Sequence, residues 1–220
     1  KYVDQLSTTT LGYSFDLSAS TWDGTFDDNG TTIHYFDDVT KSPLANQAYF
    51  STALSSWSQY SVFSFYEDDA APNIVVFEAD TDTNVAGASN NENADGFTLR
   101  DNVQNGEYDA AELALDENVV LSTPRGYWVA LHEIGHVLGL SGDYLLETID
   151  SSYSTDITVM SYNVPNGRYA ITPMALDILA LEEIYGAASF NAFDGNIYLY
   201  VQGSSSTQEF SGQKRSQTIM

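Results

Sequence analysis

Residues 130–144, ALHEIGHVLGLSGDY, hold the pattern that most constrains this chain. His132 and His136 are four positions apart, so on a helix their imidazoles project from the same side, with Cβ atoms about 5–6 Å apart. That spacing suits two ligands of one tetrahedral zinc. Glu133 is rotated from His132 by about 100°, where its carboxylate reaches a metal-bound water instead of the metal. The segment therefore predicts two metal ligands and a general base.

Turn-forming residues at both ends define this segment as a helix. Thr123 and Pro124 are a typical helix start, with a capping hydroxyl before a proline. Gly139 is placed to end the helix, because glycine adopts the left-handed conformation after a last turn at little cost. Between these points an apolar core stripe repeats at helical spacing, namely Tyr127, Leu131, Ile134 and Leu138.

Strand-like runs dominate the first half of the chain. Three runs rich in β-branched and aromatic residues, at 31–36, 62–67 and 73–78, are bounded by Asp, Asn, Gly or Pro. Residues 80–105 show little periodicity, so we expect a long loop or an irregular edge strand there. A further apolar run at 112–121 leads into the histidine helix.

Two more helices are expected, one on each side of the histidine helix in the sequence. The first begins at Ser42 and Pro43, and the second begins at Thr172 and Pro173 and ends at Gly186. Their apolar stripes are Phe50, Leu54 and Trp57 in the first, and Met174, Ile178, Leu181 and Tyr185 in the second. A strand, a helix and further strands predict a partly parallel sheet.

The composition excludes several classes of function. Seven Lys and Arg residues against 31 Asp and Glu give a formal charge of -24, so a nucleic acid or an acidic membrane surface would be repelled. The chain has no cysteine, which rules out a disulfide framework or a thiolate ligand. No run approaches the roughly 20 apolar residues of a membrane span. A length of 220 residues is consistent with one domain.

Two later motifs extend the pattern. Residues 158–163 read TVMSYN, and residues 172–186 read TPMALDILALEEIYG. With HEIGHVLGL, these motifs resemble the metzincin zinc endopeptidases, and specifically the serralysin-like secreted bacterial proteases, over about 124–186. The resemblance implies an α+β, zincin-like catalytic domain. It would contain a twisted mixed sheet of about five strands, three main helices and an active-site helix followed by a Met-turn.

The resemblance assigns roles to single residues. His132 and His136 match the two zinc ligands on the helix, and Glu133 matches the general base. Met160 matches the methionine of the Met-turn, which packs beneath the metal without binding it. Tyr162 matches a tyrosine that reaches the zinc in the resting enzyme and supports the oxyanion once substrate binds. A phenol near a metal is independently a sensible donor to a developing oxyanion.

The third zinc ligand departs from the family pattern. The family places a histidine at position 142, where this chain has Gly142, and its remaining histidine, His34, reads as a structural strand residue. Zinc also accepts carboxylate oxygen. Asp143 is therefore the predicted third ligand. Weaker candidates for the third ligand are Glu147 and Asp150.

The resemblance also implies a domain plan and a setting. Residues 1–190 would form one catalytic domain, with an upper subdomain to about 140 and a lower one from 141, and residues 191–220 would be an extension without calcium-binding repeats. We expect a secreted, extracellular monomer that binds zinc, with calcium as a second ion. Its partners would be a protein or peptide substrate and a proteinaceous inhibitor. The candidate substrate-binding edge is Val85, Ala86, Gly87, Ala88 and Ser89.

The predicted function is zinc-dependent hydrolysis of peptide bonds by a water that Glu133 activates. Two alternatives stay open. The altered third ligand favours a catalytically impaired metzincin-fold module for binding or adhesion. A gluzincin would complete the site with Glu182 or Glu183, which the VMSY turn disfavours.

Overall fold

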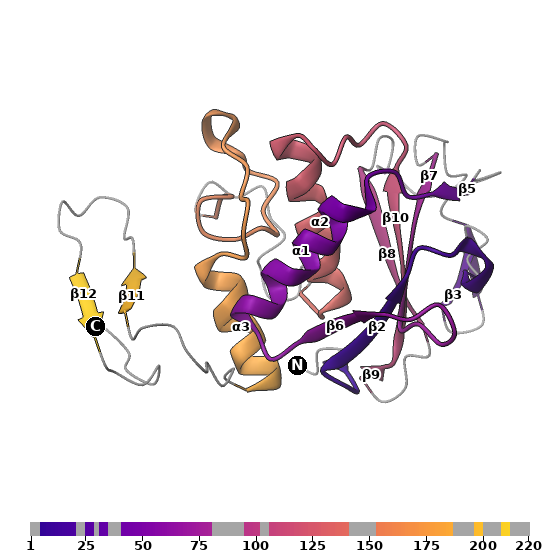
Figure 1. Ribbon diagram of the computed structural model, residues 1–220, viewed down its shortest axis with the longest axis horizontal. Helices are drawn as coiled ribbons and strands as arrows, with labels where there is room; N and C mark the ends of the chain where they lie inside the picture. The colour runs from indigo at the N-terminus through magenta and orange to yellow at the C-terminus, as the bar shows by residue number, and fades with distance from the viewer. Residues whose placement is uncertain are drawn as a thin grey trace. The chain divides into compact units, whose positions relative to one another are not determined.

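The computed structural model describes residues 5–20, 25–28, 31–34, 41–80, 95–101, 106–140, 153–186, 196–199 and 208–211. The chain forms two compact units, Lys1–Ala187 and Ala188–Met220. The first unit contains a mixed sheet and three α-helices (Figure 1), so the predicted α+β class is confirmed. None of the described helices combines the length and the apolar character needed to cross a membrane.

A six-stranded mixed sheet forms the base of the first unit. Its strands are β2 (Thr10–Ser14), β5 (Lys41–Pro43), β6 (Ser64–Glu67), β7 (Ile74–Ala79), β8 (Gly96–Asp101) and β10 (Ala110–Asp116). The strand order is β6-β2-β7-β10-β8, and β5 pairs with β7. The four strands β6, β2, β7 and β10 are parallel, whereas β8 runs antiparallel to β10 and β5 antiparallel to β7. The predicted partly parallel sheet is confirmed.

Three helices complete the first unit, and two of them, α1 and α2, pack against each other beside the sheet (Figure 1). They are α1 (Gln47–Tyr60), α2 (Pro124–Val137) and α3 (Ala175–Tyr185). Trp57 of α1 is fully buried and donates its indole N–H to the carbonyl of Leu131 on α2 at 3.2 Å. One apolar core joins these helices to one face of the sheet. A smaller core lies on the other face, formed by Val75, Phe77, Ala79 and Ala114. The histidine helix is thus held by packing along most of its length.

The boundaries of α2 agree with the sequence prediction. Thr123 caps the helix, and its hydroxyl accepts the backbone N–H of Gly126 at 3.1 Å. Pro124 occupies the first turn, where a missing N–H costs nothing. Gly139 has a φ of 93°, which is the left-handed conformation that ends the helix.

One prediction of local structure was wrong. Ser42 and Pro43 do not start a helix. They lie in β5, where Pro43 pairs opposite Phe77, and α1 begins after Asn46, which has a φ of 58° and redirects the chain. A proline is tolerated in such a peripheral strand because one side of the strand needs no N–H donor.

Two further predictions concern strands. The predicted strand at 31–36 is present as β4 (Thr31–His34), which pairs with β3 (Thr25–Asp28) in a separate two-stranded sheet. Of the two alternatives for 80–105, the described residues contain an edge strand, β8, whose six residues pair with β10 in a regular register. Alternate side chains of β8 serve opposite faces, since Phe97 packs on the smaller core while Thr98 contacts α2.

Short elements connect or extend these layers. In the first unit, β1 (Gln5–Leu6) pairs in parallel with β9 (Glu107–Tyr108), and two 3-10 turns, η1 (Leu17–Ala19) and η3 (Pro165–Gly167), lie in the connections. The second unit contains β11 (Asn196–Leu199) and β12 (Gln208–Ser211), which pair antiparallel.

Candidate metal centre

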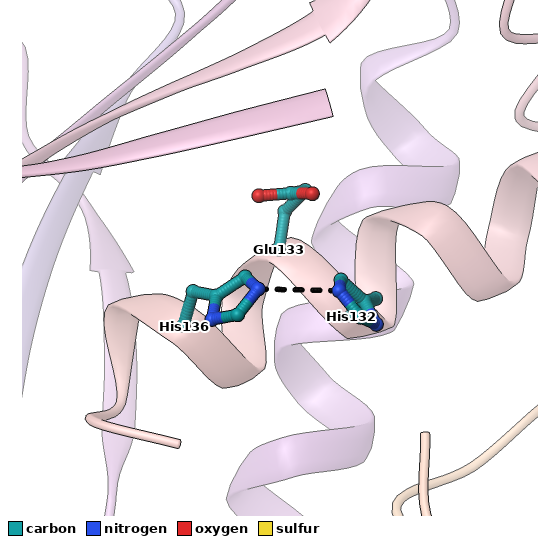
Figure 2. A group of neighbouring side chains, drawn as sticks. All are labelled: His132, Glu133 and His136. Atoms are coloured by element: carbon teal, nitrogen blue, oxygen red, sulfur yellow. Dashed lines mark hydrogen bonds between the residues drawn. The ribbon is translucent and has the colours of Figure 1, made fainter. Parts of the chain in front are cut away.

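The two histidines of α2 face each other across one helical turn (Figure 2). The Nδ1 atom of His132 lies 3.0 Å from the carbonyl oxygen of Val159, and the Nδ1 atom of His136 lies 2.8 Å from that of Leu140. A carbonyl oxygen can only accept, so both Nδ1 atoms carry the proton. Both Nε2 atoms are then unprotonated in the neutral rings, and they lie 3.1 Å apart.

This tautomer assignment has a chemical consequence. Two nitrogen lone pairs that point at each other at 3.1 Å repel unless a cation lies between them. A shared proton would require an imidazolium, but burial lowers the pKa of His136 to about 4, and the charge of Arg100 lowers it further. The hydrogen bond to Leu140 acts in the opposite direction and is outweighed. At neutral pH, burial therefore disfavours a proton shared between the two rings.

The donor set fits zinc. His132, Glu133 and His136 are the group of potential ligands that converges within the described residues, with ligand atoms within 4.8 Å of one another. Zinc–nitrogen bonds measure about 2.0–2.1 Å, so two imidazole nitrogens separated by 3.1 Å can share one ion. Hydrogen bonds from each Nδ1 to a carbonyl are the usual support for a metal-bound imidazole.

Glu133 leaves the same helix in a different direction from the histidines (Figure 2). Its side chain is buried beneath β8, and the hydroxyl of Thr98 lies 2.8 Å from its Oε2 atom and 3.1 Å from its carbonyl oxygen. Gly96, at the start of β8, leaves the space, because a Cβ atom there would lie 2.7 Å from the Glu133 Cγ. The edge strand therefore fixes the position of this carboxylate.

Met160 lies directly under α2 and is fully buried. A Cβ atom at Gly135 would lie 2.5 Å from its sulfur, so the helix admits this side chain only because position 135 is glycine. The preceding residue, Val159, places its carbonyl where it accepts both the Trp128 indole N–H at 2.8 Å and the His132 Nδ1–H. The turn at 158–160 thus supports the histidine helix from below.

Asp177 of α3 holds this turn in place. Its buried carboxylate accepts the Thr158 hydroxyl at 2.6 Å, the Val159 N–H at 2.9 Å and the Met174 N–H at 2.7 Å. Burial raises the pKa of Asp177 to about 6, and the three donated hydrogen bonds act against that rise. A single residue therefore connects Asp177 to His132, because Val159 donates its N–H to one and accepts from the other with its carbonyl.

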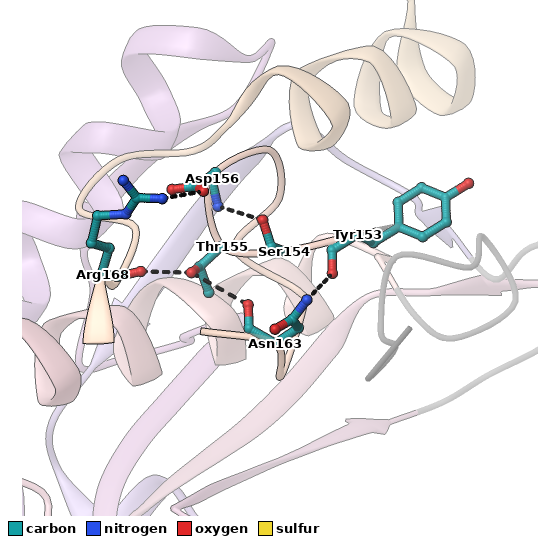
Figure 3. A network of polar contacts seen from close by, with 6 residues as sticks. All are labelled: Tyr153, Ser154, Thr155, Asp156, Asn163 and Arg168. Atoms are coloured by element: carbon teal, nitrogen blue, oxygen red, sulfur yellow. Dashed lines mark hydrogen bonds and ion pairs between the residues drawn. The ribbon is translucent and has the colours of Figure 1, made fainter. Parts of the chain in front are cut away.

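Tyr162 lies above the site and is 49% exposed, with its ring centroid 5.2 Å from that of His132. The residues on either side of it are tied back to Tyr153, whose carbonyl accepts the Ser161 hydroxyl at 3.0 Å and the Asn163 amide at 3.2 Å. Further polar contacts close the same loop, as Figure 3 shows for the Thr155 hydroxyl, which donates to the Arg168 carbonyl at 2.6 Å. The phenol is thus carried by a closed, cross-linked loop.

No protein-family model matches it, and no curated protein matches it.

Several predicted site residues fall outside the described part of the chain. They are Asp143, Glu147 and Asp150, which follow α2 in the sequence, and the edge candidates Val85, Ala86, Gly87, Ala88 and Ser89. The structure brings together His132, Glu133, His136, Met160 and Tyr162. Within the described residues, neither Glu182 nor Glu183 belongs to the converging group, so the gluzincin alternative gains no support.

Three residues of the site were missed in the sequence. Thr98 and Arg100 lie on β8, and alternation with Phe97 and Leu99 was the signal that could have identified them. Both point to α2, where Arg100 donates from Nε and Nη2 to the His136 carbonyl at 3.1 and 3.0 Å. Asp177 had a weaker signal, an acidic residue in the first turn of an otherwise apolar helix.

Proposed function

We propose that this protein is a zinc-dependent endopeptidase of the metzincin type. One observation carries the proposal, namely the convergence of the Nε2 atoms of His132 and His136 at 3.1 Å with the Glu133 carboxylate beside them. The resemblance of the VMSY turn and the helix at 172–186 to serralysin-like enzymes supports it. The position of Met160 against Gly135 also agrees with the role that the resemblance gives to Met160.

The metal would be held by His132 and His136, with Asp143 as the third protein ligand. Bound zinc supplies a Lewis acid that polarises the scissile carbonyl and lowers the pKa of water to about 7. Zinc also binds carboxylate oxygen, so an aspartate is chemically adequate in place of the histidine absent at position 142.

The protein's own groups would carry the proton transfers. Glu133 accepts the proton of the attacking water and passes it to the leaving amine. Thr98 holds one carboxylate oxygen of Glu133, which orients the base before substrate arrives. Tyr162, next to His132 and partly exposed, would donate a hydrogen bond to the oxyanion that develops on the scissile carbonyl.

The setting follows from the same proposal. The substrate would be an extended protein or peptide, and a proteinaceous inhibitor would compete with it for the site. The enzyme would act as a secreted, extracellular monomer. A formal charge of -24 keeps such a chain soluble and disfavours binding to nucleic acid.

A casein assay tests the proposal. We expect the zinc-loaded protein to hydrolyse unfolded casein, a strong chelator to abolish that activity, and added zinc to restore it. Glu133→Gln keeps the size and the Thr98 contact but removes the base, so it should retain zinc and lose hydrolysis. Chelator-insensitive hydrolysis, or full activity in Glu133→Gln, would exclude the proposed function.

A catalytically impaired binding or adhesion module is the second candidate. It is favoured by one observation, the glycine at position 142 where the family has a histidine ligand. The two candidates differ in one result. A protein that binds zinc in its folded state but cleaves no unfolded substrate with zinc in excess is a module of this kind.

A further inference from the structure

Arg100 contacts the last turn of the histidine helix from the edge strand. Its Nε and Nη2 atoms donate to the backbone carbonyl of His136 at 3.1 and 3.0 Å. The same carbonyl oxygen also accepts the N–H of Gly139 at 3.0 Å, so the guanidinium binds the second lone pair of that oxygen. The contact therefore joins a fixed cation to the backbone of a proposed metal ligand.

The guanidinium is itself held in place. It lies over the ring of Tyr108, with Cζ 5.2 Å from the ring centroid. The Tyr108 hydroxyl donates to the carbonyl of Val137, the next residue of the helix, and the Tyr185 hydroxyl donates to that of Leu138 at 3.0 Å. Three consecutive carbonyls at the end of α2 are thus bound by side chains from β8, β9 and α3.

The physical reason lies in how helices end. The last carbonyls of a helix have no partner in the helix itself, and the last turn frays unless something binds them. A cation at this end also complements the partial negative charge of the helix dipole. His136 sits in this last turn, and its Nδ1 partner, the carbonyl of Leu140, lies just beyond the helix. Movement of the turn would therefore displace His136 Nε2 from His132 Nε2.

We propose that Arg100 is a positioning residue of the metal centre, which fixes the last turn of α2 through the His136 carbonyl so that His136 Nε2 converges with His132 Nε2. This inference rests on the proposed zinc site. Arg100 lies outside the segment that holds His132, Glu133 and His136, and it acts through the His136 carbonyl. Supporting partners of metal ligands typically change metal affinity by about 10–100-fold when they are removed.

Zinc affinity in the full chain provides the test, measured by competition with a fluorescent chelator. Arg100→Met removes both hydrogen bonds and the charge, and should weaken zinc binding about 10–100-fold. Arg100→Lys keeps the charge but lacks the planar fork, so it should give an intermediate affinity. The cobalt-loaded protein gives a second readout, because a displaced imidazole changes the visible absorption spectrum of the ion.

Two matched controls separate positioning from general stability. Asn73→Ala also removes two side-chain hydrogen bonds to backbone, those with Gly12 and Asp109 at 2.9 Å each, but both lie outside α2. Arg125→Met removes a cation that pairs with Asp95 at the surface. Both controls should bind zinc as the unmodified protein does and give its cobalt spectrum.

The outcomes distinguish this inference from the proposed function. If Arg100→Met leaves both the zinc affinity and the cobalt spectrum unchanged, the inference is overturned. Tighter zinc binding in Arg100→Met would also overturn it, because it would mean that charge repulsion outweighs positioning. An equal loss in Asn73→Ala would also overturn it. If the protein binds zinc with the predicted Arg100 effect but cleaves no casein, the inference stands and the peptidase function fails. If the unmodified protein binds no zinc, both fail.

Discussion

The carboxylate of Asp177 accepts the backbone N–H of Val159 at 2.9 Å, and the carbonyl of Val159 accepts the Nδ1–H of His132 at 3.0 Å. A buried acid on α3 is thereby linked through one residue to a proposed metal ligand on α2. Such an indirect contact orients an imidazole and fixes its tautomer, which leaves Nε2 for the metal. The turn at 158–160 therefore links two helices that are distant in sequence.

Asp177 should make stability depend on pH. Burial raises the pKa of Asp177 to about 6, whereas an aspartate in the unfolded chain has a pKa of about 3.9. The folded state then binds this proton more tightly, so its stabilising effect is complete below about pH 4 and is lost as the pH rises through about 6. We expect a loss of up to about 3 kcal/mol from this group. Urea unfolding of the unmodified protein and Asp177→Asn across this range measures it.

Comparing the unmodified protein with Asp177→Asn isolates the contribution of the Asp177 carboxyl, because the many other acids titrate in both proteins. The free-energy difference between them should shrink as the pH rises from about 4 to about 7. A difference that stays constant over the range would contradict the raised pKa of Asp177.

Gly135→Ala should destabilise the fold even though alanine is the better helix former by about 1 kcal/mol. The new Cβ atom would lie 2.5 Å from the Met160 sulfur, so a fully buried side chain has to move. We expect a loss of about 1–3 kcal/mol in the free energy of unfolding, measured by urea denaturation.

The same substitution in a Met160→Ala background is the control. With the methionine removed, the nearest remaining atom is Cζ2 of Trp57 at 3.5 Å, which is an ordinary van der Waals contact, so alanine at 135 should be neutral or stabilising. Additive effects of the two substitutions would show that the Met160 contact does not explain the requirement for glycine.

Thr98→Val should slow peptide hydrolysis without weakening zinc binding. Valine matches threonine in shape but cannot donate to the Glu133 carboxylate, which the hydroxyl contacts at 2.8 Å. A hydrogen bond to a charged group contributes about 1.5–3 kcal/mol, so kcat on a peptide substrate should fall about 10–100-fold. Thr98→Ser keeps the hydroxyl and should keep most of the activity. Equal rates for valine and serine variants would disprove this role.

Asp143→Ala tests the predicted third ligand. Removing a direct ligand should cost more than removing a supporting group, so zinc affinity should fall by more than about tenfold. The matched variants Glu147→Ala and Asp150→Ala remove nearby carboxylates in the sequence and should leave the affinity unchanged. A loss in one of these two variants, with Asp143→Ala unaffected, would transfer the ligand role to that residue.

Local signals in the sequence predicted the elements that depend on local contacts. The ends of α2 follow from Thr123, Pro124 and Gly139, whose capping and left-handed backbone act within one turn. Ser42 and Pro43 carried a similar start signal, but pairing of Pro43 with Phe77 captures them in a strand. That pairing joins segments far apart in the chain, which no local pattern contains.

The candidate site also combines residues that local sequence patterns predict with residues that only long-range contacts bring in. The spacing of His132 and His136 follows from helix geometry alone, so their convergence was predictable. Thr98 and Arg100 contact α2 from 35 and 36 residues away, and Asp177 contacts Val159 from 18 residues away. Their roles depend on the register of β8 and on the packing of α3, which become visible only in the folded chain.

The central claim is that His132 and His136 bind one zinc ion together, and anomalous scattering at the zinc edge from crystals of the zinc-loaded protein tests it most directly. We predict a single strong peak about 2.0–2.1 Å from the Nε2 atoms of both histidines. A map with no peak between these two atoms, or with zinc bound only elsewhere on the protein, would contradict the account.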